Sequence, residues 1–98
     1  MPEQETFTRR IIVEGYVQGV GYRHFAYRAA MRLGVSGWVR NRVDGTVEAL
    51  ISGAPDKVEA MLAELRRGPL GADVRSVRLA EANGVHWKAG DFAITLTI

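Results

Sequence analysis

The stretch that decides the fold spans residues 10–34 and reads RIIVEGYVQGVGYRHFAYRAAMRLG. Its β-branched start predicts a strand over 10–14, and the three glycines within 15–21 predict a loop. Apolar residues then recur at the spacing of one helical face; they are Tyr22, Phe25, Ala26, Ala29, Ala30 and Leu33. Gly34 is well placed to end this helix in a left-handed conformation. The stretch therefore predicts a strand, a glycine-rich loop and a helix in direct succession.

The next part of the chain predicts a hairpin and a second helix. Two strand-like runs, 35–42 and 46–52, are joined through Asp-Gly at 44–45. This dipeptide is typical of hairpin turns, because such turns need positive φ. A second helix is expected from near Pro55, since proline suits the first helical position. It should end at the Gly-Pro pair at 68–69.

The remaining chain predicts two more strands and completes the fold class. Run 74–80 is strand-like, and apolar residues alternate with Ala and Thr over 92–98, as in a half-buried strand. The order is βαββαβ with a short extra C-terminal strand. Two helices cannot cover both faces of such a sheet, so we expect an α+β, ferredoxin-like α/β sandwich with an antiparallel sheet and both helices on one face. We expect residues 1–8 to be a loosely ordered tail and 9–98 to form one domain.

Composition narrows the classes of function and the compartment. The chain has 98 residues and no cysteine, which excludes cysteine-dependent phosphatases and thiolate metal sites. There is no run of 18 apolar residues, so no membrane span is expected. The first eight residues are polar and acidic, unlike a signal peptide, so we expect a cytoplasmic protein. A net charge of +2 suits an anionic ligand only mildly.

The loop before the first helix is a candidate phosphate site. Free backbone N–H groups and the helix dipole favour an anion at a helix N-terminus. Gly19 and Gly21 can adopt positive φ and let a ligand approach the backbone, and the Arg23 guanidinium matches two phosphate oxygens. A tight turn followed by a solvated arginine would explain the same residues. No Gly-Lys-Ser/Thr motif is present, and the dinucleotide fingerprint is incomplete because it ends in His24.

Two motifs resemble those of the acylphosphatase family. The first is GYVQGVGYR at 15–23, and the second is LGVSGWVRN at 33–41. The segments DGTVE at 44–48 and Gly-Pro at 68–69 are also similar to the family, so the resemblance covers nearly all of the chain after residue 8. The commonest family residue before the arginine is phenylalanine, whereas this chain has Tyr22. That change keeps the ring and adds a hydroxyl.

The resemblance implies hydrolysis of the carboxyl–phosphate anhydride bond of a small-molecule acyl phosphate, giving carboxylate and inorganic phosphate. It implies that Arg23 holds the phosphate and that Asn41 holds the attacking water. The implied phosphate-binding loop comprises Gln18, Gly19, Val20, Gly21, Tyr22 and Arg23. No metal and no cofactor is expected, and a monomer is expected. Taken alone, Asn41 would more simply be a polar residue that satisfies a nearby turn.

Other functions of the same residues are less consistent with their chemistry. His24 could act as a general base, but as a neighbour of Arg23 in the first helical turn it is expected to face another way. His24 and His86 lack metal-ligand spacing. The βαββαβ order also occurs in RNA-recognition modules, but the strand over 46–52 lacks their aromatic residues, so no nucleic acid is expected.

Two further functions would use the same binding residues. One is a non-catalytic module that binds phosphate or another anion, and the second is an acylphosphatase-like domain of a carbamoyl-phosphate-handling maturation enzyme. The end of the chain directly after its last strand favours a free-standing enzyme.

Overall fold

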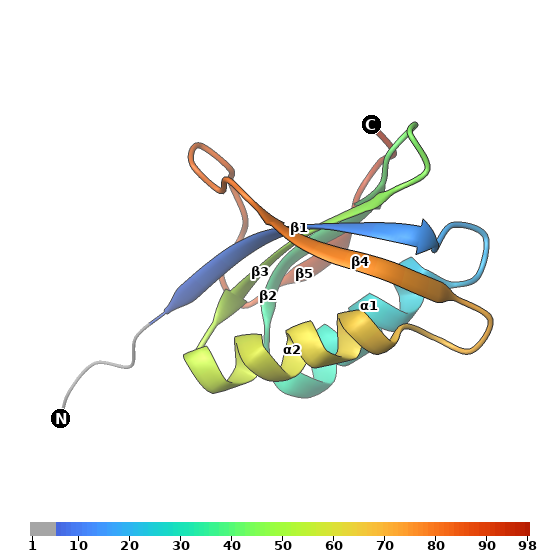
Figure 1. The fold of residues 1–98 in the computed structure, drawn as a ribbon. Coiled ribbons are helices and arrows are strands. Elements are labelled where there is room, and N and C mark those ends of the chain that lie inside the picture. The colour runs from blue at the N-terminus through green and yellow to red at the C-terminus, as the bar shows by residue number, and fades with distance from the viewer. Residues whose placement is uncertain (1–5) are drawn as a thin grey trace, which may run out of the picture.

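Two helices lie side by side against one face of a five-stranded sheet (Figure 1). The computed structural model describes residues 6–98. The elements are β1 (Phe7–Tyr16), α1 (Tyr22–Leu33), β2 (Ser36–Asn41), β3 (Val47–Gly53), α2 (Pro55–Arg67), β4 (Asp73–Ala80) and β5 (Phe92–Ile94). The expected ferredoxin-like βαββαβ order with an additional C-terminal strand is therefore confirmed.

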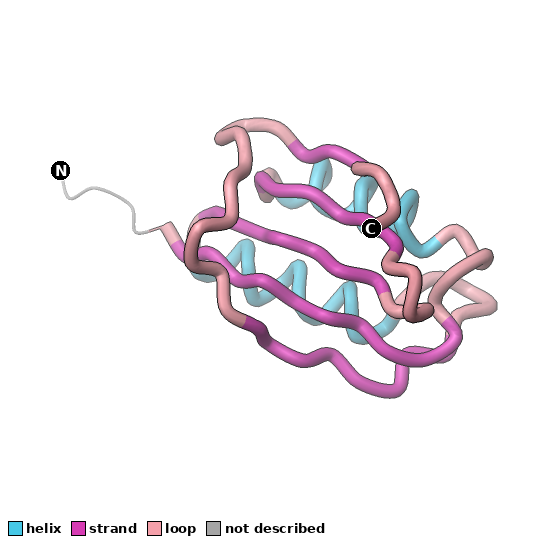
Figure 2. The backbone as a smooth tube through the Cα atoms, turned by 90° about the horizontal axis from the view of Figure 1, so that it is seen from above, coloured by secondary structure: helices cyan, strands magenta, loops and turns pink. Residues whose placement is uncertain are grey.

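The strand order in the sheet is β4-β1-β3-β2-β5. The first four strands pair antiparallel, as expected, but β5 runs parallel to β2, with Gly37 opposite Phe92. The sheet is therefore mixed rather than wholly antiparallel. The physical reason is the connection 81–91, which carries the chain from β4 at one edge to the opposite edge (Figure 2). A crossover of this kind can deliver a parallel strand, whereas a short hairpin cannot.

The C-terminal strand is shorter than the alternation over 92–98 predicts. Regular pairing ends at Ile94, although the chain still follows β2 through bonds from Thr95 N to Val39 O and from Ile98 N to Asn41 O. Phe92 is buried, with its ring 6.5 Å from that of Tyr27 on α1. Ile98 is exposed. Beyond this contact with α1, the apolar alternation does not produce a buried face.

The N-terminal strand starts earlier than expected. β1 begins at Phe7, and residues 7–8 pair with Ser52 and Gly53 of β3. This part of the expected tail over 1–8 is therefore strand, because β3 offers backbone partners that the local sequence does not reveal. Residues 1–5 lie outside the described residues.

The main core lies between the helices and one face of the sheet. The apolar stripe predicted for the first helix is confirmed at Tyr22, Ala26, Ala29 and Ala30, and α2 buries Val58, Met61, Leu62 and Leu65. Gly34 ends α1 with φ of 74°, and Pro55 is the first residue of α2, as expected. In β3, every residue from Val47 to Ser52 is buried, so this central strand is covered on both faces. Within residues 6–98, no helix is long and apolar enough to cross a membrane.

Candidate active site

The loop between β1 and α1 exposes a row of backbone amides. Gly19 and Gly21 have φ of 76° and 78°, in the left-handed region that the sequence predicts for them. Gly21 caps α1, and the bond from Phe25 N to Gly21 O closes the first helical turn. The N–H groups of the three residues 22–24 precede this bond, and neither a side-chain cap nor an acidic residue occupies the first turn. The helix therefore presents donors and a positive dipole end to a ligand.

A cavity of about 80 Å³ lies at this helix end and joins the two sequence motifs. It is lined by Val17, Gly19, Gly21, Tyr22, Arg23, His24 and Asn41. The structure thus brings together Arg23 and Asn41, which belong to different motifs and to different elements. Gln18 and Val20 do not line the cavity. Val20 instead packs, partly buried, against the main core.

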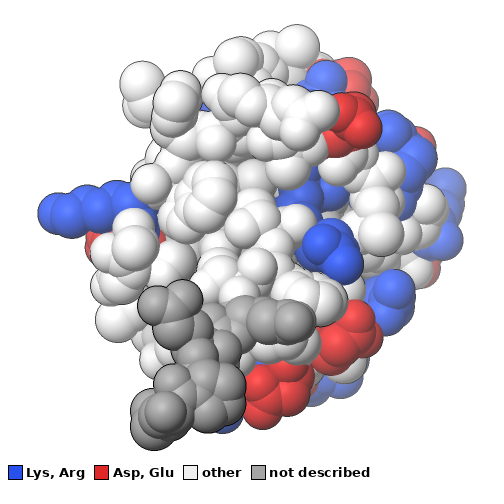
Figure 3. Space-filling model, turned by 90° about the vertical axis from the view of Figure 1, so that its left-hand side faces the viewer, with Lys and Arg blue, Asp and Glu red and all other residues white. Residues whose placement is uncertain are grey.

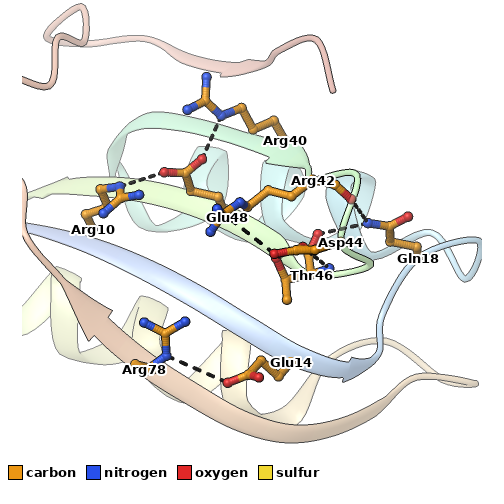
Figure 4. Close-up of polar contacts among 9 residues, drawn as sticks. All are labelled: Arg10, Glu14, Gln18, Arg40, Arg42, Asp44, Thr46, Glu48 and Arg78. Carbon is orange, nitrogen blue, oxygen red and sulfur yellow. Dashed lines mark hydrogen bonds and ion pairs between the residues drawn. The ribbon is translucent and has the colours of Figure 1, made fainter. Parts of the chain in front are cut away.

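Gln18 ties the loop to the β2–β3 hairpin. Its Nε2 donates to Arg42 O at 2.7 Å and to Thr46 O at 2.8 Å (Figure 4). Both carbonyls belong to the turn that directly follows Asn41, so the amide holds the loop against the end of β2. The sequence predicts a phosphate contact for Gln18 but gives no signal for this bridge, because the bridge depends on the packing of two distant segments.

Asn41 is the last residue of β2, and strand alternation sets its direction. Val39 is buried in the main core, so Asn41, two residues later, shares its face, whereas Arg40 and Arg42 point to the open face. Asp44, and not Asn41, is the polar residue that satisfies the turn, because its Oδ1 accepts from Thr46 N and Thr46 Oγ1. No side-chain hydrogen bond joins Asn41 to another residue within 6–98, which leaves its amide available at the cavity.

Arg23 faces the cavity without a carboxylate beside it. No Asp or Glu is among the residues that line this cavity. Within the described part of the chain, no ion pair or side-chain hydrogen bond occupies its guanidinium. Its planar set of donors is therefore available to two oxygens of a phosphoryl group.

The hydroxyl of Tyr22 has a specific partner in helix α2. The ring is buried, and Tyr22 Oη donates to Leu65 O at 2.7 Å. In a continuing helix this carbonyl would accept from the residue four positions later, but that residue is Pro69, which has no N–H. The hydroxyl supplies the missing donor and links the start of α1 to the end of α2. Burial raises the pKa of Tyr22, so its hydroxyl stays protonated.

His24 also borders this cavity, although its side chain is expected to point away from that of Arg23. The cavity wraps around the end of α1, where consecutive residues of the first turn all border the ligand space, so helical spacing alone does not separate them. His24 is exposed to solvent. Over residues 6–98, no group of three or more His, Cys, Asp or Glu side chains comes together as a metal site would require.

Comparisons with known proteins bear on the family and the fold. A family model described as Acylphosphatase matches residues 9–94. A curated acylphosphatase of Bordetella parapertussis is 54% identical over 77 residues, which cover 79% of this chain and 82% of the relative. The crystal structure of acylphosphatase from Bacillus subtilis superposes with a TM-score of 0.83 at 32% identity, over 93% of this chain and 99% of that one. Full-length HypF, in a phosphate- and nucleotide-bound form, matches with a TM-score of 0.84 at 26% identity, over 98% of this chain but 13% of HypF.

Proposed function

The chain belongs to the acylphosphatase family, the hydrolases of acyl phosphates, and we propose roles for two of its residues in that reaction. Arg23, with the backbone amides of residues 22–24 at the start of α1, binds the phosphoryl group, and Asn41 orients the attacking water. The observation that carries this proposal is the single cavity that both side chains line at the N-terminus of α1. The loop and the strand end face each other there, held by the two hydrogen bonds of Gln18.

The chemistry of the leaving group explains why few protein groups are needed. Water attacks phosphorus, the bond from phosphorus to the acyl oxygen breaks, and the carboxylate leaves with the electron pair. A carboxylic acid has a pKa of about 4, so the carboxylate needs no proton from a general acid at neutral pH. The remaining demands are neutralisation of the phosphoryl charge and alignment of the water. Arg23 and the amides of residues 22–24 meet the first demand.

Asn41 meets the second demand. Its amide carries both donors and an acceptor, so it can hold a water in one orientation. It is also neutral, whereas an aspartate at this position would repel the bound phosphate. The proton of the water passes to a phosphate oxygen of the substrate, so the reaction requires no protein base.

The size of the cavity bears on the substrate. A volume of about 80 Å³ accommodates a group of a few non-hydrogen atoms. The phosphoryl group fills such a space, and the acyl part then lies outside it. We therefore propose that the enzyme accepts a range of acyl groups and recognises mainly the phosphate.

The test is hydrolysis of an aryl acyl phosphate by the purified protein, with a chelator present, beside Arg23→Ala and Asn41→Ala. Each variant should lose at least about 100- to 1000-fold in kcat, because each removes an interaction with the transition state. Circular dichroism and thermal unfolding check that both variants are folded. Near-wild-type turnover in either folded variant would remove that residue from the proposal.

His24 is the group in the cavity that could serve as a base instead. The pH profile of kcat/KM distinguishes the two mechanisms, because a protein base produces a limb at its own pKa. We expect no limb near a histidine pKa in the wild type and the same profile in His24→Gln. A limb that is present in the wild type and absent in His24→Gln would overturn the base-free mechanism.

The match to HypF supports a second candidate function. The whole fold of this chain recurs as a small part of that larger protein. The fold alone therefore does not separate a free-standing enzyme from an acylphosphatase-like domain of a maturation enzyme or from a module that binds anions without catalysis. The assay separates the enzyme from the module, because a folded wild type that binds phosphate without turnover would fit the module. A cytoplasmic location and a monomeric state stay predictions.

A further inference from the structure

A second cavity lies on the open face of the sheet, opposite the helices. Its volume is about 380 Å³, which falls within the range of small-molecule sites. Its lining residues are Arg10, Arg40, Arg42, Val43, Asp44, Glu48 and Ile98. Three arginines from β1, β2 and the turn after β2 thus converge on one hollow that the proposed reaction does not use (Figure 4).

Glu48 holds two of these arginines in place. It is 2% exposed, and its Oε1 and Oε2 accept from Arg40 Nε at 2.7 Å and from Arg10 Nε at 2.6 Å. Burial raises the pKa of this carboxyl, but the bonds from Arg40 and Arg10 outweigh burial and leave the pKa below its usual value. The carboxylate is therefore ionised at neutral pH and restricts the orientation of both guanidinium groups.

The arginines retain donors after this pairing. Arg40 and Arg10 both use Nε for Glu48, and Arg10 Nη1 also donates to Glu81 O. Within residues 6–98, no hydrogen bond occupies the two terminal nitrogens of Arg40. The guanidinium of Arg40 is also held by the Trp38 ring, whose centroid lies 4.6 Å from Arg40 Cζ.

Arg42 supplies the third guanidinium group of the cavity. Its Nη2 lies 4.0 Å from Asp44 Oδ2, the limit of an ion pair, and Asp44 already accepts two bonds from Thr46 through its Oδ1. Glu48 and Asp44 balance two of the three arginine charges, and the C-terminal carboxylate of Ile98, another lining residue, is a third acidic group at the cavity. The cavity therefore attracts an anion not through net charge but through fixed guanidinium groups with free N–H donors, which match the oxygens of a phosphate.

Neighbouring segments limit the shape of the ligand. The connection 81–91 crosses the open face (Figure 2). It is bonded to β2, because Trp38 Nε1 donates to His86 O. At the other side Ile98 N donates to Asn41 O, and Val43 N donates to Ile98 O. At the end of the molecule away from the phosphate loop, basic and acidic side chains lie intermixed beside an uncharged area (Figure 3). The connection 81–91 and the C-terminal segment bound the open face on two sides, which favours a compact anion over an extended polymer.

We propose that the open-face cavity is a second anion site, which binds a compact phosphate or diphosphate through Arg10, Arg40 and Arg42. This site is separate from the cavity at α1, because Arg40 and Arg42 project to the face opposite Asn41. Glu48 acts there as the group that positions two of the arginines.

The experiment titrates inorganic pyrophosphate into the Arg23→Ala variant at constant ionic strength and follows backbone amide shifts by NMR. The Arg23→Ala background removes the guanidinium of the first cavity. We expect saturable shifts at the amides around residues 10, 40–44 and 48. Adding Arg42→Ala should weaken this binding by about tenfold or more, the usual loss for a charged hydrogen-bonding partner.

Arg78→Ala is the matched control. Arg78 is an arginine of the same sheet that pairs with Glu14 at 3.7 Å and lies outside the cavity (Figure 4). Its removal changes the net charge by the same amount, so it should leave the pyrophosphate affinity within about twofold of its parent, as expected for a distant surface charge. If Arg42→Ala does not fold, Arg42→Gln takes its place.

Three results would overturn the proposal. One is the absence of saturable shifts at the cavity amides, and another is equal weakening by Arg42→Ala and Arg78→Ala, which would indicate general electrostatics. The third comes from a parallel titration with a single-stranded oligonucleotide: tighter binding than pyrophosphate, with shifts along the whole open face, would identify a polymer surface instead.

Discussion

Arg23 and Arg40 are both partly buried, but their surroundings differ in one decisive way. Arg23 borders a cavity that no carboxylate lines. Arg40 bonds to Glu48, which is 2% exposed and shared with Arg10. An arginine without an acidic partner keeps all its donors for a ligand, whereas a paired arginine uses part of them to stabilise the fold. Whether an arginine has an acidic partner therefore indicates its role better than the exposed fraction of its side chain does.

The largest expected effect tests the unpaired arginine. Arg23→Lys keeps the positive charge but loses the planar fork, so kcat/KM should fall by about 100-fold or more. Arg78→Lys, an exposed arginine paired with Glu14, serves as the control and should match the wild type. Steady-state hydrolysis of one acyl phosphate measures both. A loss of only a few-fold in Arg23→Lys would mean that charge alone suffices at this position.

The next effect tests the paired arginines. Glu48→Gln removes the buried carboxylate between Arg10 and Arg40, and should lower the free energy of unfolding by about 2–3 kcal/mol. This is less than for fully buried partners, because the two arginine side chains are 24% and 27% exposed and gain solvation. Chemical denaturation measures the change.

Glu64 offers a matched control for this variant. It also accepts from two arginines, Arg32 and Arg67, but these side chains are 60% and 66% exposed. Glu64→Gln should therefore lower the free energy of unfolding by at most about 1 kcal/mol. Equal losses in the two variants would show that burial does not distinguish the two carboxylates.

A smaller effect concerns the hydroxyl that joins the two helices. Tyr22→Phe leaves Leu65 O without its donor and should lower the free energy of unfolding by about 1–2 kcal/mol. Tyr16→Phe, at an exposed ring, should change it by less than about 0.5 kcal/mol. Thermal and chemical unfolding of both variants measure the difference. An unchanged stability in Tyr22→Phe would mean that water or another donor replaces the hydroxyl.

The smallest expected effect is the pH dependence that Glu48 contributes. Burial raises the pKa of this carboxyl, and the hydrogen bonds from Arg40 and Arg10 lower it by more than burial raises it. The net lowering of the pKa is therefore the difference between two opposed effects. A carboxyl with a lowered folded pKa stabilises the protein above its unfolded pKa of about 4.3, and this contribution disappears as the pH falls through the folded value. Stability should therefore decline below about pH 4.3, and the decline should be shallower in Glu48→Gln. An equal decline of stability with pH in the wild type and in Glu48→Gln would mean that carboxyls other than Glu48 cause it.

Local sequence patterns predicted most of the fold. The helix over 22–33, its end at Gly34 and the turn around Asp44 follow from periodicity and from the φ preferences of glycine, which act within a few residues. The proximity of Arg23 and Asn41 follows from two motifs that resemble one family, together with the chemistry expected of a helix N-terminus. The parallel pairing of β5 was not predicted, because the alternation of a strand contains no information about the direction of its partner.

The sequence by itself determined the elements, their order, the glycine-rich loop and the resemblance that implies the reaction. Only the tertiary structure decided the roles of Gln18, Tyr22 and Glu48. The partners of Gln18 lie 24 and 28 positions away in the chain, and the partner of Tyr22 lies 43 positions away. The two partners of Glu48 lie 38 and 8 positions away. The reason is physical. A backbone preference is a property of a few neighbouring residues, whereas a side-chain hydrogen bond exists only after packing has brought two segments together. The availability of Arg23 and the confinement of Arg10 and Arg40 are both products of that packing.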